Sequence, residues 1–310
     1  MPLRASILKV LAYFDLFDYP VLEEEILYFL DIEVEASALN AELAALTTEK
    51  CLFRTGDLYS LQDNPALAER RIRGNRRADE LLPVADRISR MLYQFPYVRG
   101  VGISGSLSKH YADENADIDY FIITRSNRLW IARTLMHLYK KLSYLRGRQS
   151  WFCMNYYVDE EALEIKEKNI FTATEMFTLL PASGNGGLVK FFDANDWTTA
   201  YFPHYRDRPR QPSAPAHSTF LKKALERLFD NRFGDRLDDF LQRLTSRRWK
   251  KKEDRGDLND HGLRISLQNE KHFSRPNPRV FQKKVLSAYT QKLNELEEKW
   301  QLTPIPSSGN

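Results

Sequence analysis

Residues 105–120 decide the fold of this chain, and they read GSLSKHYADENADIDY. A Gly-Ser pair precedes a polar, turn-rich segment, and two aspartates, Asp117 and Asp119, then stand at the start of the apolar run FIIT. Residues two apart in a strand point to the same side, so we expect these carboxylates side by side, with Ile118 facing the core. Because such a pair repels itself unless a cation neutralises it, the pattern indicates a divalent metal with oxygen ligands, namely magnesium.

The flanking residues predict two buried strands. YVRGVGIS at 97–104 leads into the Gly-Ser pair, and DIDYFIIT at 117–124 follows the polar segment. Glycine has no Cβ, and the backbone N–H groups and the serine hydroxyl of such a turn can donate hydrogen bonds to a phosphate. We therefore expect Gly105 and Ser106 to face a phosphate group.

Together these residues resemble a known signature. Gly105-Ser106 and Asp117-Ile118-Asp119, with eleven positions from Ser106 to Asp117, are similar to the motif of the DNA polymerase β-like nucleotidyltransferase superfamily, with the spacing of its minimal bacterial members. The resemblance covers mainly residues 98–160. It implies that Gly105 and Ser106 hold a nucleoside triphosphate and that Asp117 and Asp119 bind two magnesium ions, which activate an acceptor hydroxyl and stabilise the leaving pyrophosphate. A capped acidic turn is the alternative interpretation.

One departure from the family pattern follows the Gly-Ser pair. The minimal enzymes often have arginine and glycine there, whereas this chain reads Leu-Ser-Lys-His at 107–110. Lys109 is the candidate for an additional charge on the phosphates, with an ordinary surface lysine as the alternative. His110 is expected to be a loop residue, and neither side chain is expected to be catalytic.

The resemblance also implies a third carboxylate on a later strand. Residues 151–158, WFCMNYYV, predict that strand, and strict alternation would place Asn155 and Asp159 on one face with Cys153. Asp159 lies four residues further, roughly 13 Å along an extended strand. By position we assign Asn155 to the catalytic set with Asp117 and Asp119, and Asp159 is the next candidate. Because Asn155 carries an amide and not a carboxylate, the alternative is a catalytically inactive module of the same fold that binds a nucleotide or a partner.

An acidic head precedes this core. Three helical patterns and then CLFRTGDLYSL, which predicts two strands around a Thr-Gly-Asp turn, resemble a winged helix-turn-helix. Residues 1–62 carry four Lys or Arg and eleven Asp or Glu, a net charge of −7, which leaves +11 for the rest. Because such a charge repels phosphates, we expect a packing or protein-contacting role and no binding of duplex DNA. A nucleotide-sensing DNA-binding regulator is the competing hypothesis.

The remaining segments are predicted to be mostly helical. Residues 64–93 are helical in pattern, and the five arginines between positions 70 and 77 form either a solvated face or a basic rim. Pro83 is expected to begin a helix. Residues 169–205 predict two helices, on which the resemblance implies acceptor contacts by Asn195, Trp197 and Tyr201, with core packing as the alternative. A Pro-rich break separates them from the last hundred residues, where the basic run at 247–252 is either solvated or a contact for nucleic acid.

The sequence thus predicts an α+β protein of three parts: a winged helix-like domain at 1–66, a small mixed-sheet nucleotidyltransferase core flanked by helices at 67–205, and a helical region at 206–310. No apolar run approaches the length of a membrane span, and the two cysteines, Cys51 and Cys153, predict neither a disulfide scaffold nor a zinc site. We expect a cytoplasmic protein. Its expected partners are a nucleoside triphosphate and a hydroxyl acceptor, either a small molecule or a protein side chain.

Overall fold

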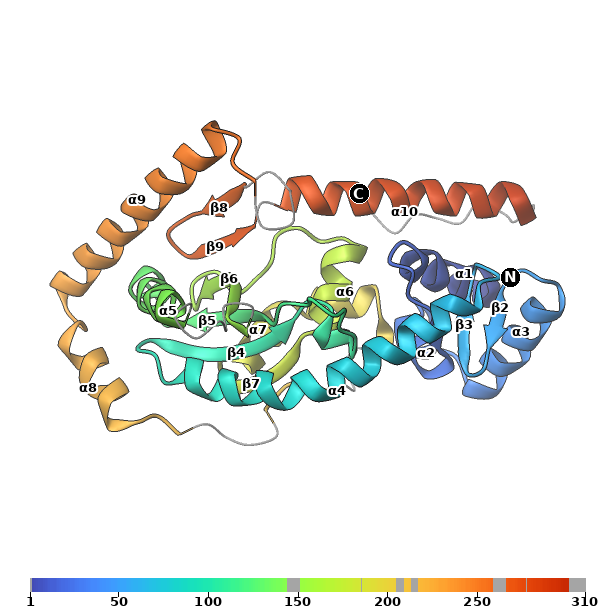
Figure 1. Cartoon of the computed structure of the whole chain (residues 1–310), viewed down its shortest axis with the longest axis horizontal. Coiled ribbons are helices and arrows are strands. Elements are labelled where there is room, and N and C mark those ends of the chain that lie inside the picture. Colours follow the sequence, from blue (N-terminus) through green and yellow to red (C-terminus); the bar gives the residue numbers. More distant parts are fainter. Residues whose placement is uncertain are drawn as a thin grey trace.

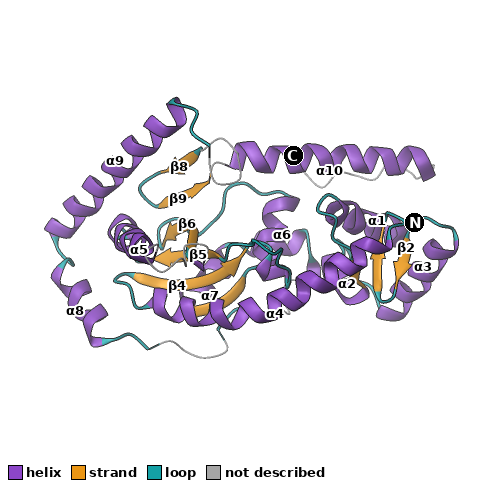
Figure 2. Ribbon diagram, in the orientation of Figure 1, coloured by secondary structure: helices purple, strands orange, loops and turns teal. Residues whose placement is uncertain are grey.

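The computed structural model describes residues 2–143, 151–184, 186–204, 209–212, 217–258, 266–276 and 278–300. Over these residues the chain is a mixed α and β protein with one large and one small sheet (Figures 1 and 2). None of the described helices is long and apolar enough to cross a membrane. The α+β class predicted from the sequence is confirmed.

The large sheet has six strands in the order β7-β4-β5-β6-β9-β8. Its members are β4 (Val98–Ser104), β5 (Asp119–Thr124), β6 (Cys153–Asp159), β7 (Leu180–Gly184), β8 (Leu267–Asn269) and β9 (Phe273–Pro276). Only the β5 and β6 pair is parallel, and the helix α5 (Leu129–Ser143) provides the crossover between these strands. The first ends of β5 and β6 therefore meet at one edge of the sheet, beside the turn that follows β4.

Alternation along the strands divides the core between the two faces of the sheet. Tyr120 and Ile122 pack with α5 and with the long helix α4 (Pro65–Tyr93), whereas Phe121 and Ile123 pack on the opposite face. That opposite face is covered by α6 (Ile170–Thr178) and α7 (Gly187–Ala194), and the short 3-10 helix η4 (Asp196–Ala200) follows α7. The single helix predicted for residues 189–205 is thus broken after α7.

The head contains the predicted three helices and hairpin. Its elements are α1 (Pro2–Asp15), β1 (Val21–Leu22), α2 (Glu23–Phe29), α3 (Ala36–Thr48), β2 (Phe53–Thr55) and β3 (Leu58–Ser60). The three strands form a small antiparallel sheet in the order β1-β3-β2, and Gly56 turns the hairpin with a φ of 64°. The apolar core of the head is continuous with the α6 and α7 side of the large sheet. The head is therefore packed on the rest of the chain.

Two long helices connect the head with the large sheet. Helix α4 leaves the head and runs along the sheet, and α10 (Pro278–Trp300) extends from the sheet to the head, where it packs on α1 (Figure 1). The predicted helix start at Pro83 is wrong, because α4 is continuous through that residue. Pro83 lies on the exposed side of α4, so water can hydrate the carbonyl group that the missing proline N–H leaves without a partner.

The predicted helical character of residues 206–310 is correct in part. Helices α8 (Phe220–Leu228), α9 (Arg232–Asp254) and α10 occur there, but residues 267–276 form β8 and β9, which extend the large sheet beyond β6. The expectation of an entirely helical region is wrong at this point. These strands have three and four residues, which is too short for an alternation signal, and β9 forms because it can pair with β6.

Arg71 joins α4 to the head. Its side chain is 2% exposed, its Nη2 lies 2.7 Å from Glu25 Oε1, its Nη1 donates to the carbonyl oxygen of Pro20, and its guanidinium stacks 3.8 Å from the ring centroid of Tyr19. Arg73 lies on the exposed side of the same helix, with a side chain that is 70% exposed and 3.9 Å from Glu69. The arginine run therefore combines a buried interdomain contact at Arg71 with a solvated face at Arg73.

We predict that Arg71→Met lowers the free energy of unfolding by about 3 kcal/mol, because the variant leaves the partly buried Glu25 carboxylate without its cationic partner. The matched control, Arg73→Met, should change the same quantity by less than about 0.5 kcal/mol, as expected for an exposed pair within a helix. Urea denaturation of both variants measures the difference. Equal effects would show that Arg71 does not join the two parts.

Candidate active site

The turn after β4 has a tightly fixed backbone. Gly105 has a φ of 70°, and Ser106 precedes the 3-10 turn η1 (Leu107–Lys109). The carbonyl oxygen of Ser106 accepts hydrogen bonds from the backbone N–H groups of Lys109 and Tyr111, and the Ser108 hydroxyl donates to the Gly105 carbonyl. Ser106 itself is exposed at the end of the strand. The turn thus presents Ser106 to solvent on a rigid backbone.

Gly105 lies directly against the carboxylate of Asp119. Ser104 of β4 pairs with Asp119 of β5, and a Cβ atom added to Gly105 would lie 2.5 Å from Asp119 Oδ2. The positive φ favours glycine at position 105, and any side chain there would also displace the carboxylate of Asp119. The Gly-Ser turn and the second aspartate of the motif, fourteen positions apart in the sequence, form one site.

Asp119 is the first residue of β5, as predicted, whereas Asp117 lies two residues before the strand, with the fully buried Ile118 between them. The pKa of Asp119 is raised to about 6, mainly by burial and in addition by the negative charges of Asp117 and Glu175, while hydrogen bonds from Cys153 and Asn155 oppose this shift. The site therefore contains more negative charge than its surroundings neutralise. Such a place favours a proton or a cation.

Asn155, one of the two candidates for the third position, contacts Asp119. Its Nδ2 donates to Asp119 Oδ1 over 2.9 Å. The register between β5 and β6 shifts there, with Tyr120 opposite Met154 and Phe121 opposite Tyr156. The predicted strict alternation is therefore wrong, because this bulge separates the face of Asn155 from that of Tyr157, which packs in the core beside α5.

Asp159, the other candidate, lies at the opposite end of β6, where it pairs with Thr124. It is fully buried and accepts hydrogen bonds from the backbone N–H groups of Asn127 and Glu161, and His272 Nδ1 lies 2.9 Å from its Oδ2. These contacts fix the loops at that end of the sheet. Of the two candidates, the structure places Asn155 beside Asp119.

Lys109 is paired with Glu175, a carboxylate that was not among the predicted site residues. Its Nζ lies 2.8 Å from Glu175 Oε1 on α6 and donates to the Gly105 carbonyl oxygen over 3.2 Å. His110 is exposed and contacts Asp79 on α4, which agrees with its predicted loop role. Lys109 therefore lies at the predicted site, but it neutralises Glu175 there.

A cavity of about 370 Å³ opens beside these residues. Ser104, Gly105, Asp119 and Asn155 line one end of it. Its other polar lining residues come from α6, from the loop before it, and from the last part of the chain: Glu167, Thr172, Glu175, Arg275 and Gln282. Glu175 is the single charged residue in the helix sequence IFTATEMFT, whose other residues are apolar or bear a hydroxyl group. An isolated charge of this kind is a sequence signal by which Glu175 could have been predicted as a site residue. Arg275 lies on β9, a strand that the sequence did not reveal.

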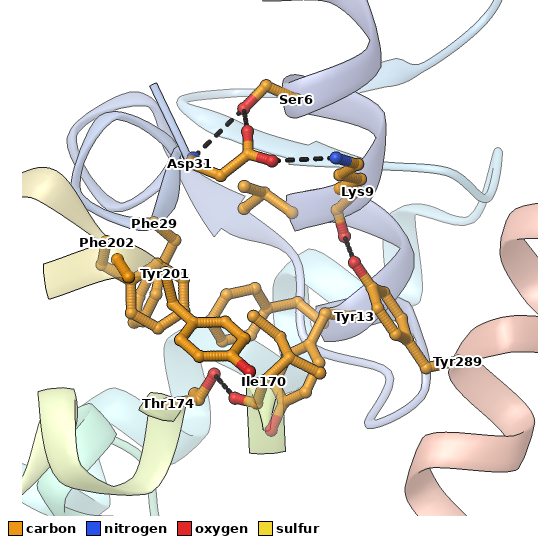
Figure 3. Close-up of a pocket in the computed structure, with 13 residues that line it drawn as sticks. Ser6, Lys9, Tyr13, Phe29, Asp31, Ile170, Thr174, Tyr201, Phe202 and Tyr289 are labelled. Carbon is orange, nitrogen blue, oxygen red and sulfur yellow. Dashed lines mark hydrogen bonds and ion pairs between the residues drawn. The ribbon is translucent and has the colours of Figure 1, made fainter. Parts of the chain in front are cut away.

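The acceptor contacts implied by the resemblance lie elsewhere. Asn195 is fully buried, donates to the carbonyl oxygens of Leu163 and Phe191, and accepts from the N–H of Ile165. Tyr201 lines a separate cavity of about 140 Å³ between α1, α6 and α10 (Figure 3). Trp197 packs against the core. These three residues do not line the cavity beside Asp119.

No cluster of three or more His, Cys, Asp or Glu side chains is placed to hold a metal ion within the described ranges. Asp117 and Asp119 supply two carboxylates, and hard oxygen ligands of this kind suit magnesium when phosphate oxygens and water complete the coordination. The residues present therefore offer two of the oxygen ligands that a magnesium ion requires.

Comparison of the chain with protein-family models, with curated proteins and with solved structures found no match. The functional argument consequently rests on the residues of the site.

Proposed function

We propose that this protein is a magnesium-dependent nucleotidyltransferase that moves a nucleoside monophosphate from a triphosphate to a hydroxyl acceptor. The observation that carries the proposal is the close approach of Gly105 to Asp119, which joins the Gly-Ser turn and the second aspartate of the motif in one site beside a cavity. If these residues act as they do in the nucleotidyltransferase superfamily that they resemble, the Gly-Ser turn and the aspartate must lie next to each other. A capped acidic turn does not require the glycine to lie against the carboxylate.

The residues have separate roles in this proposal. Asp117 and Asp119 hold magnesium, which supplies charge neutralisation and activation of the acceptor hydroxyl when it is bound. Gly105 and Ser106 receive the phosphates, because the turn has little steric bulk and Ser106 is exposed. Lys109, which is paired with Glu175 beside the turn, adds a positive charge near the phosphates.

The head acts as a scaffold in this proposal. The order of its three helices and small sheet supports a winged helix-like domain, while Glu42 of α3 and Glu49, directly after α3, are ion-paired with Arg4 of α1. The Tyr19 hydroxyl donates to the carbonyl oxygen of Lys109 over 2.5 Å. We infer that the head supports the Gly-Ser turn and that it does not read duplex DNA.

Calorimetry of the full chain with MgCl₂ and each of ATP, CTP, GTP and UTP tests the proposal, with EDTA as the metal-free arm. We expect binding of at least one triphosphate only when magnesium is present.

A second experiment tests transfer. The protein incubated with isotope-labelled triphosphate and cell extract should release pyrophosphate and produce a labelled acceptor, identified by mass spectrometry. Binding without pyrophosphate release would instead favour the inactive nucleotide-binding module, for which the amide of Asn155 is the motivating observation. Absence of binding would exclude both.

We predict that Asn155→Asp raises the affinity for magnesium, measured with the triphosphate present, by about tenfold, because a third carboxylate strengthens a hard-cation site. Without metal, the same variant should be less stable by about 1 kcal/mol, since a carboxylate replaces the amide that donates to Asp119. Magnesium titrations and melts in EDTA measure the two effects. Asn155→Ala is the control that removes the hydrogen bond without adding charge, and weaker magnesium binding by Asn155→Asp than by Asn155→Ala would contradict the assignment.

A further inference from the structure

The cavity beside Asp119 has walls that are mainly apolar. Three aromatic residues line it from the sheet and α7, namely Phe121, Tyr156 and Phe191, and two more, Phe171 and Phe281, come from α6 and α10. Ile165, Met176, Leu179 and Pro276 complete the apolar lining. Phe171 and Phe281 contact each other edge to face, with ring centroids 5.9 Å apart. A ligand in this cavity is therefore enclosed by rings and aliphatic side chains.

Most charged groups of the lining are already paired with each other. Glu175 binds Lys109, and Arg275 binds Glu167 through two contacts of 2.8 and 2.5 Å. Arg275 also donates to the Tyr156 hydroxyl. Within the described lining, Asp119 is the carboxylate that has no cationic partner. A ligand therefore meets little unpaired charge away from the catalytic end.

The neutral polar groups of the lining are also satisfied in part. Gln282 Nε2 donates to the Thr172 hydroxyl over 3.1 Å, and Asn155 donates to Asp119. A polyol or the polar edge of a nucleobase would lose its hydrogen bonds to water and find few partners here, which is unfavourable. A polycation would lack free carboxylates beyond the aspartate pair. An apolar ring loses nothing and gains burial.

We propose that this cavity binds the acceptor and that the acceptor is a neutral, ring-bearing alcohol or phenol whose hydroxyl lies at the Asp119 end. The inference rests on the proposed function. In the transfer, the acceptor oxygen bonds to the α-phosphorus, the bond from that phosphorus to the oxygen bridging to the β-phosphate breaks, pyrophosphate leaves, and the hydroxyl proton is released to solvent. The cavity volume of about 370 Å³ lies within the range of small-molecule sites.

The experiment uses the full chain and 2-naphthol as a neutral aromatic probe. Direct binding is measured by ligand-observed NMR without nucleotide, and transfer is measured with MgCl₂ and labelled triphosphate. Three comparison compounds separate the classes: 2-methoxynaphthalene, which has the rings without the hydroxyl, inositol as a polyol, and an aminocyclitol that carries several ammonium groups. We expect both naphthalenes to bind, 2-naphthol alone to be labelled, and the other two to do neither.

Phe281→Ala tests the location, because Phe281 lines the cavity and is 49% exposed, so its loss should be tolerated by the fold. The matched control is Phe240→Ala on α9, which is 55% exposed and lies outside the lining. Phe281→Ala should raise the Kd of 2-naphthol at least about fivefold, and Phe240→Ala should leave it within about twofold. The Kd of the magnesium triphosphate should be unchanged in both variants.

Several results would overturn the inference. Failure of 2-naphthol to bind, or labelling of inositol or the aminocyclitol in its place, would show that the cavity does not select an apolar ring. Weaker triphosphate binding by Phe281→Ala with unchanged 2-naphthol binding would assign the cavity to the nucleobase. If 2-naphthol binds at Phe281 but no triphosphate binds, the proposed function fails and the acceptor role fails with it, whereas triphosphate binding without 2-naphthol binding removes the inference alone.

Discussion

Asp119→Asn is expected to remove magnesium-dependent triphosphate binding while leaving the metal-free protein at least as stable as the parent. The variant loses a carboxylate that the proposal assigns to the metal, so its Kd for the magnesium triphosphate should rise at least about a hundredfold. Stability should change in the opposite direction, because the raised pKa of Asp119 shows that its ionised form is unfavourable in the folded protein.

The sign of the pH dependence follows from this raised pKa. The folded protein holds the Asp119 proton more tightly than the unfolded chain, so ionisation lowers stability as the pH rises from the ordinary value of 3.8 through about 6. A difference of about two pKa units corresponds to at most about 3 kcal/mol. We expect Asp119→Asn to be more stable than the parent by about 1–3 kcal/mol at pH 7.5, with little difference near pH 4.

Thermal melts in EDTA at both pH values, and with MgCl₂ and triphosphate at pH 7.5, measure these effects. Glu69→Gln is the matched control, since this acid on α4 has a 73% exposed side chain and lies outside the site. A structural capping role for Asp119 predicts the reverse, a loss of about 1 kcal/mol without metal. If the variant is less stable at pH 7.5, or retains full stabilisation by the magnesium triphosphate, the assignment of Asp119 is wrong.

The centre of the site could be predicted because its determinants are local. Gly105 and Ser106 follow one apolar strand, and Asp117 and Asp119 precede the next, so a hairpin of two neighbouring strands is enough to bring them together. The same reasoning placed Asn155 on the next strand. The strict alternation of side chains predicted the wrong face of the sheet for the residues after Asn155. A bulge adds one residue to β6 at this point, and the alternating pattern in the sequence does not show it.

The walls of the cavity could not be predicted because they depend on distant pairing. Arg275 and Phe281 come from residues more than a hundred positions after β6, and they reach the site because β9 pairs with β6. The strand β7 was also missed, since LPASG contains a proline and follows a helical pattern directly. Pro181 is accommodated because β7 is the edge strand of the sheet, where a missing N–H has less effect.

Whether a charged side chain is buried and paired, or exposed to solvent, likewise cannot be predicted from composition. Arg71 and Arg73 are two positions apart in one basic run, yet only Arg71 is enclosed, and its partner Glu25 is 46 positions away in the sequence. Glu175 similarly pairs with Lys109 only because the packing of α6 places the two side chains next to each other. In both cases the sequence shows the charge, and the tertiary fold determines whether it is solvated or paired.

Gly105→Ala should have the second large effect, because it combines a backbone cost with a steric conflict. A non-glycine residue at a φ of 70° costs roughly 1 kcal/mol. The new methyl group would also lie 2.5 Å from Asp119 Oδ2 and 3.3 Å from its Cβ, so the carboxylate or the turn must move. We expect a loss of about 2–3 kcal/mol in the free energy of unfolding and a Kd for the magnesium triphosphate at least about tenfold higher.

Gly56→Ala separates the two contributions. Gly56 has a similar φ of 64° in the hairpin of the head, but an added Cβ there meets nothing within 4 Å, so this variant incurs the backbone cost alone. The additional destabilisation in Gly105→Ala then reports the contact with Asp119. Urea denaturation and calorimetry on both variants measure it, and Gly56→Ala should bind the magnesium triphosphate like the parent. If Gly105→Ala matches Gly56→Ala in both measurements, the turn does not fix the carboxylate, and the juxtaposition on which the proposed function rests has no role in binding.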